Sequence, residues 1–224
     1  MLWYKNWLET RWRVAFAVGL YSLEMFAMYR GGRQPEKVAL TFAMLWIITS
    51  VFSAGTGIKT QSAYLATTKG VHGSTDFTLS MPVSRTTLFG IRTTLGLLQM
   101  AVVIVAANFS LWVIFPFLHA NNSLLMAIES GLSIFACCLS FYFLSALLAL
   151  FFDPQWQMYA GVAVVGLAWW YTRDIHSNLN FFNALGTGAP LVTHTIPWPA
   201  IATSIAIGTI LCVATLRIIE TREF

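Results

Sequence analysis

The sequence predicts an all-α integral membrane protein with six transmembrane helices, an N-terminal amphipathic helix in the membrane interface, and both termini in the cytoplasm. Of its 224 residues, 57% are hydrophobic and only 10% are charged, and the mean hydropathy is +0.68. Soluble domains carry about 25% charged residues. The apolar residues are gathered into long runs, and a helix of about 20 such residues crosses the hydrocarbon core. The chain therefore accommodates six spans in a single domain over 1–224.

Six apolar runs are separated by segments that contain charged residues, glycine or proline, the residues that punctuate helices. Two of the connections are long, 59–92 and 172–197, whereas the others are short. The predicted spans are 14–29, 38–58, 93–115, 126–152, 156–171 and 198–219.

The first residues, 1–13, differ from the membrane core in pattern. On a helix, Lys5, Glu9 and Arg13 align at i, i+4 spacing, and Trp3 and Trp7 lie on the opposite side. This arrangement favours a helix that lies in the interface with its indole rings at headgroup level. The alternative is a tryptophan-rich flank of the first span.

The basic residues predict the orientation, because cytoplasmic loops are enriched in lysine and arginine. Nine of them fall on one side of the six-span topology and four on the other, so the nine are placed in the cytoplasm together with both termini. The net charge of +4 is explained in this way, and no basic cluster is long enough to follow a nucleic acid. The nine are Lys5, Arg11, Arg13, Lys59, Lys69, Arg85, Arg92, Arg217 and Arg222, and the four are Arg30, Arg33, Lys37 and Arg173.

The cytoplasmic connection 59–92 has the composition of an ordered segment, since it contains apolar residues and a Gly-x-x-Gly break at Gly70 and Gly73. Pro82 ends the preceding element, and Ser84 is expected to cap the helix that continues into the third span. Arg85 and Arg92 are seven residues apart and therefore share one face of that helix. A structured loop of this kind suits the docking of a soluble partner.

Segment 75–92, TDFTLSMPVSRTTLFGIR, resembles the loop between spans two and three of ABC type-2 transporter permeases, in which an apolar run ends in Leu-x-x-Pro-Val-Ser-Arg. The N-terminal WLETRWR is similar to the interfacial elbow helix of that family, and the closing IIETREF to its cytoplasmic tail. Family members often carry a glutamate shortly before the glycine of the coupling loop. Here 66–70 has no acidic residue, and Asp76 is the candidate replacement.

The resemblance implies a permease subunit of an exporter, located in the bacterial plasma (inner) membrane and without catalytic residues of its own. ATP and Mg would be bound by a separate ATPase subunit, and a second permease copy or a similar permease would complete the path, so this chain needs no cofactor. Segment 172–197 would form extracellular re-entrant helices, with Phe181, Phe182 and Asn183 at the gate. The residues expected to couple to the ATPase are Thr68, Lys69, Gly70, Asp76, Pro82, Ser84 and Arg85.

Glu24 is the acidic residue that lies deepest inside a predicted span, whereas Glu129 lies near the start of one. An ionisable residue at the membrane centre costs roughly 2.5–3.5 kcal/mol and is a functional candidate by default. The alternative is a structural pair with Arg30 near the outer interface.

Other chemistries are disfavoured. Gly55–Lys59 has Ile58 where a Walker A loop requires glycine directly before lysine. The three cysteines lie in apolar runs without metal-ligand spacing, which predicts packing residues and no metal site. The remaining alternative function is an ATP-independent secondary transporter or channel, which predicts several membrane-buried charges and broken helices in corresponding halves.

Overall fold

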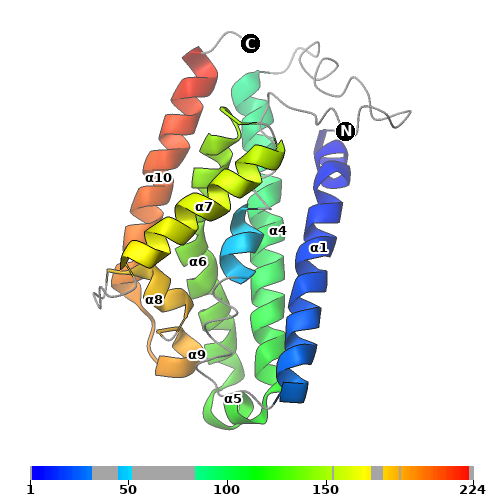
Figure 1. Ribbon diagram of the computed structural model, residues 1–224, viewed down its shortest axis with the longest axis vertical. Coiled ribbons are helices and arrows are strands. Elements are labelled where there is room, and N and C mark those ends of the chain that lie inside the picture. The colour runs from blue at the N-terminus through cyan, green and yellow to red at the C-terminus, as the bar shows by residue number, and fades with distance from the viewer. Residues whose placement is uncertain are drawn as a thin grey trace.

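The computed structural model describes residues 2–31, 45–51, 84–152, 154–172, 179–186 and 188–221, and all regular structure within them is helical (Figure 1). A short helical stretch occupies 45–51. The labelled helices are α1 (Leu2–Gly31), α4 (Arg85–Ile114), α5 (Pro116–Asn121), α6 (Leu124–Leu148), α7 (Pro154–Thr172), α8 (Phe181–Leu185), α9 (Pro190–Thr193) and α10 (Trp198–Thr221).

Three helices of the described chain are long and apolar enough to cross a membrane, namely Thr86–Ile114, Leu124–Leu148 and Trp198–Thr221. They correspond to the predicted third, fourth and sixth spans. The predicted first span lies within α1, where a shorter apolar stretch covers Val14–Ala27. The fifth is α7, a 19-residue helix that crosses the others obliquely (Figure 1).

Most of the predicted second span, 38–58, lies outside the described residues, as does the part 59–83 of the connection 59–92. A topology of six spans therefore stays a prediction, whereas an all-helical chain with three membrane-length helices is established for the described residues.

Helix α6 is the centre of the bundle. In its most apolar window 56% of the residues are buried, against 39% for α4 and 28% for α10, and it packs against both of these helices. Small residues permit close approach. A Cβ on Gly131 would lie 3.2 Å from the Cα of Val105, and one on Gly208 would lie 3.4 Å from the carbonyl carbon of Leu139.

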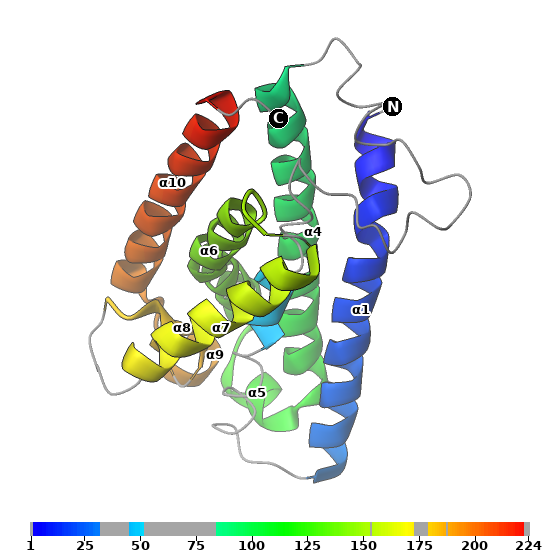
Figure 2. The same cartoon turned by 45° about the horizontal axis from the view of Figure 1, so that its top comes forward.

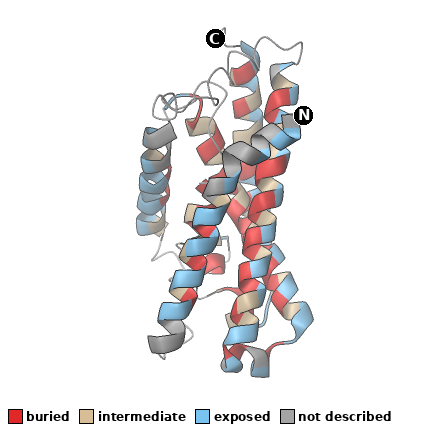
Figure 3. Ribbon diagram, turned by 90° about the vertical axis from the view of Figure 1, so that its right-hand side faces the viewer, coloured by how far each residue is buried: buried red, intermediate tan, exposed pale blue. Residues whose placement is uncertain are grey.

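The outer faces of these helices expose large apolar side chains. Leu23, Leu98, Leu132, Leu167 and Ile210 are each more than half exposed, and they come from five different helices. Figure 3 shows such exposed positions along the outside of the helices and buried positions where the helices meet. Soluble proteins rarely expose apolar surface on this scale, so the distribution fits a lipid surrounding.

The predicted amphipathic helix and first span form one helix, because α1 runs from Leu2 to Gly31 without a break near residue 13. Its burial is one-sided: Ala17, Tyr21 and Met25, spaced by four, are buried, and α1 packs on α4. The position of its first turns in a membrane interface stays a prediction.

The two ends of the bundle are built differently. The start of α1, the start of α4 and the end of α10 lie at one end, while α5 and α9 lie at the opposite end (Figures 1 and 2). We call the first the Ser84 end, after the residue just before α4, and the second the Asn122 end, after the residue just past α5.

Candidate functional site

Ser84 caps the N-terminus of α4. Its backbone is extended (φ −64°, ψ 146°), and its Oγ accepts a hydrogen bond from the backbone N–H of Thr87 at 3.1 Å. The same Oγ lies 3.0 Å from the hydroxyl of Thr86 and 2.7 Å from that of Thr87. The first turn of a helix has unpaired N–H groups, and this serine satisfies one of them. The expected helix start at Ser84 is confirmed.

The first turns of α4 pack against the last turns of two other helices. Leu88 and Phe89 of α4 form a buried cluster with Leu150 and Ala146, near the end of α6, and with Ile219, near the end of α10. Leu150 and Ile219 are almost completely buried, at 1% and 0% exposed. Three helix ends are therefore held together directly beside the Ser84 cap.

Only some of the other predicted coupling residues lie within the described part of the chain. Thr68, Lys69, Gly70, Asp76 and Pro82 lie outside the described residues. Arg85 is the first residue of α4, one position after the cap. The structure therefore places the end of the predicted coupling segment at the cluster of helix ends, and the docking contacts of the loop itself stay a prediction.

Glu24 lies on α1 beside the buried face of that helix, and its side chain is half-buried. Seven residues separate it from the end of α1, which corresponds to about 10 Å along the axis at 1.5 Å per residue. One turn earlier, the hydroxyl of Tyr21 hydrogen-bonds Thr49 at 2.8 Å, and its ring packs at a tilt against Trp46 with centroids 4.9 Å apart. These contacts hold α1 against 45–51 next to Glu24.

The segment predicted to be re-entrant contains two short helices, α8 and α9. Asn180 begins α8: its Oδ1 accepts from the N–H of Phe182 at 3.1 Å, and its Nδ2 donates to the carbonyl of Thr172 at 2.9 Å. Phe182 is buried and its ring lies 4.9 Å from that of Phe181; both rings lie within 5.4 Å of Phe141 on α6. Two of the three predicted gate residues thus anchor α8 to α6.

Asn122 links three parts of the chain at the opposite end of the bundle from Ser84. Its Nδ2 donates to the carbonyls of Leu118 at 3.0 Å and Leu191 at 3.3 Å, and its Oδ1 lies 2.9 Å from Nδ1 of His194. Its backbone carbonyl accepts from the indole of Trp112 at 2.9 Å. One buried amide therefore joins α4, the turn after α5, and α9.

The geometry also assigns the ring of His194. Because both contacts of Asn122 Nδ2 are to carbonyl oxygens, Oδ1 is the acceptor and the ring must donate from Nδ1–H. His194 ends α9 in the left-handed conformation, with φ 58°.

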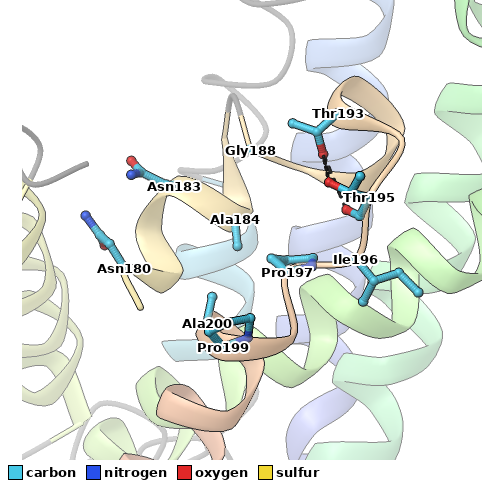
Figure 4. Close-up of a pocket in the computed structure, with 10 residues that line it drawn as sticks. All are labelled: Asn180, Asn183, Ala184, Gly188, Thr193, Thr195, Ile196, Pro197, Pro199 and Ala200. Carbon is cyan, nitrogen blue, oxygen red and sulfur yellow. Dashed lines mark hydrogen bonds between the residues drawn. The ribbon is translucent and has the colours of Figure 1, made fainter. Parts of the chain in front are cut away.

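A pocket of about 360 Å³ lies between α8, α9 and the start of α10 (Figure 4). Asn183, the third predicted gate residue, lines it, and Gly188 approaches so closely that a Cβ there would lie 2.8 Å from the carbonyl oxygen of Asn183. The lining residues are Asn180, Asn183, Ala184, Gly188, Thr193, Thr195, Ile196, Pro197, Pro199 and Ala200.

Sequence reasoning missed Asn122, His194 and most of the pocket. In the sequence, the Asn-Asn pair at 121–122 indicates only a turn, and Gly186, Gly188 and Pro190 indicate only breaks in a helix. Asn122 also makes hydrogen bonds to a segment about 70 residues away, and these bonds leave no pattern in the sequence around it. Only Asn180, an Asn two residues before the N–H that it caps, carries a readable signal.

Within the described chain, no group of three or more His, Cys, Asp or Glu side chains is arranged to hold a metal ion. Cys137, Cys138 and Cys212 are free thiols, and the first two are fully buried in the core around α6, which confirms their interpretation as packing residues. No protein-family profile, curated protein or solved structure matches this chain. The resemblance to ABC type-2 permeases thus rests on the sequence segments alone.

Proposed function

We propose that the chain is the membrane-spanning permease subunit of an ABC exporter, which forms part of the translocation path and couples to a separate ATPase subunit. The observation that supports this function is the packing at the Ser84 end. A push received at Ser84 moves Leu88 and Phe89 against Leu150 and Ile219, so that it reaches α6 and α10 together. Packed helices transmit such displacements because their interiors are close-packed.

In this proposal the termini and the 59–92 loop face the cytoplasm, and segment 172–197 faces outward in a bacterial plasma membrane. The chain crosses the membrane six times, with the oblique α7 as the fifth span. A second permease copy, identical or similar, completes the path, and the ATPase subunit binds ATP and Mg. This division into a cytoplasmic and an outward side is supported by the positions of the Ser84 end and the pocket, which lie at different ends of the bundle.

The test is affinity purification of the tagged chain after expression with its native neighbouring genes. The expected result is a stoichiometric ATPase subunit that co-purifies, and that is lost when residues 68–86 are replaced by a flexible linker. Purification of the folded chain without an ATPase would contradict the proposal. It would favour the ATP-independent transporter or channel, for which Glu24 is the first residue to replace.

A charge reversal at the coupling site gives a sharper prediction. Arg85→Glu is expected to abolish ATP-driven transport, because it places an acidic group where the partner is expected to meet a basic one, while the Ser84 cap is retained. Arg217→Glu is the matched control, since it reverses an exposed charge near the end of α10 at the same end of the bundle. Equal transport by both variants, with normal ATPase stimulation, would remove Arg85 from the mechanism.

A further inference from the structure

The pocket beside α8 has walls of two kinds. Figure 4 shows Asn180 and Asn183 on one side and Thr193 and Thr195 on the other, with Ala184 and Pro197 between them. The polar groups come from α8 and its cap and from the end of α9, whereas the apolar surface comes from small or rigid residues. A ligand that fits must therefore offer both hydrogen-bonding groups and an apolar face.

The side chain of Asn183 has unused hydrogen-bond donors and acceptors at the wall of this pocket. Within the described chain the side chain of Asn183 makes no hydrogen bond, although its backbone carbonyl accepts from the N–H groups of Gly186 and Gly188. An amide has two donors and two acceptor positions. Asn183 is half-buried at the pocket wall, so its side chain can pair with a ligand.

The two threonine hydroxyls are weakly bonded. Thr193 Oγ1 lies 3.3 Å from the carbonyls of Ala189 and Thr195, and the hydroxyl of Thr195 lies 3.3 Å from that of Thr193. Hydroxyl hydrogen bonds are usually about 2.7–2.8 Å long. Exchanging such long contacts for shorter ones with a ligand costs little and gains well-formed bonds.

The described lining favours a neutral ligand. None of its ten residues is ionisable, so it offers an anion or cation no counter-charge. A purely apolar ligand would cover the amide and hydroxyl groups and leave them without partners. A neutral group with several hydroxyls and an apolar ring face matches this lining.

We propose that this pocket binds a neutral sugar ring, held by hydrogen bonds from Asn183 and Thr195 and packed against Pro197. The volume of about 360 Å³ lies in the range of about 300–1,000 Å³ that is typical of small-ligand pockets, so a single sugar ring fits. The shape of the pocket depends on the bond between Asn122 and His194, which holds the residue between the two threonines. The binding of a sugar is independent of the proposed function. The further step, that this sugar is part of the exported substrate, rests on the proposed function.

The test is saturation-transfer NMR on the full chain in lipid nanodiscs prepared without sugar-based detergent. The probes are methyl glucoside and sodium glucuronate, which have the same ring but differ by one charge. We expect transfer to methyl glucoside and several-fold less to glucuronate. We expect the glucoside signal to fall about fivefold, the factor of one lost hydrogen bond, in Asn183→Leu and in Thr195→Val. Thr209→Val, on the exposed face of α10, is the matched control.

No transfer to methyl glucoside would overturn the inference, as would equal transfer to glucuronate or an unchanged signal in both pocket variants. Nanodiscs that contain a neutral diglycosyl lipid distinguish the source of the sugar. If that lipid displaces methyl glucoside, the pocket takes a lipid headgroup, and if it does not, the pocket takes a free saccharide. Neither arm requires the ATPase, so failure here and failure of the co-purification are separate results.

Discussion

The Ser84 end and the Asn122 end of the bundle are held by different forces. At the Ser84 end the contacts are mainly apolar, between Leu88, Phe89, Leu150 and Ile219, and the polar additions are the local Ser84 cap and one hydrogen bond from Ser145 to the carbonyl of Val51 at 3.0 Å. At the Asn122 end, one amide joins segments 69 and 72 residues apart by directed hydrogen bonds. Apolar contacts are non-directional and tolerate small rotations, whereas hydrogen bonds weaken steeply with angle. The first end is suited to move and the second to stay in register.

The largest effect is expected from truncation at the Ser84 end. Leu150→Ala removes a side chain that is 1% exposed and should lower the free energy of unfolding by about 3 kcal/mol, because the cavity remains between three helices. Leu132→Ala, on the same helix but 53% exposed, is the control and should change it little. Unfolding in mixed micelles, followed by circular dichroism, measures both. Equal losses in the two variants would show that this cluster is not tightly packed.

Asn122→Ala tests the opposite end and should cost about 2 kcal/mol, because the carbonyl of Leu191 and the ring of His194 lose the amide that bonds them. Thr209→Ala, which removes a hydroxyl bonded within its own helix, is the control. The double variant Leu150→Ala with Asn122→Ala sharpens the comparison. The ends are separated by about 37 Å, the length of the 25-residue α6, so the losses should add. Strong non-additivity would mean that the two ends are coupled.

Ser84→Ala should lower stability by about 1 kcal/mol, the usual cost of losing a helix N-cap. Ser84→Asp retains a cap acceptor and should restore most of this loss, since a carboxylate also interacts favourably with the helix dipole. Hydrogen exchange of the N–H of Thr87 is the local measurement. Unchanged protection of that N–H in Ser84→Ala would contradict the capping geometry.

The smallest effect is expected at His194. His194→Gly removes the bond to Asn122 but tolerates a φ of 58°, so it should cost about 1 kcal/mol. His194→Ala should cost more, because a Cβ is strained in the left-handed region. Unfolding in mixed micelles, followed by circular dichroism, measures both variants. A smaller loss in His194→Ala than in His194→Gly would contradict the left-handed backbone at this position.

Composition and hydropathy by themselves determined that this chain is helical and has helices of membrane length, because burial in lipid requires long apolar runs with internally paired backbones. Local patterns also predicted the cap at Ser84 and the packing role of Cys137. Each of these depends only on residues close in the chain. The predicted break between an interfacial helix and the first span did not appear, since α1 is continuous.

Only the tertiary structure decided which helix is central, how α7 crosses it, and where polar groups meet. A membrane helix can be apolar on every side, so its pattern does not tell the buried face from the lipid face, and the central place of α6 depends on Gly131 and Gly208 meeting their neighbours. The Asn122–His194 bond and the pocket of Asn183 depend on residues far apart in the chain. Hydrogen bonds between distant segments form only where folding brings those segments together, and no local periodicity in a single sequence encodes which segments meet.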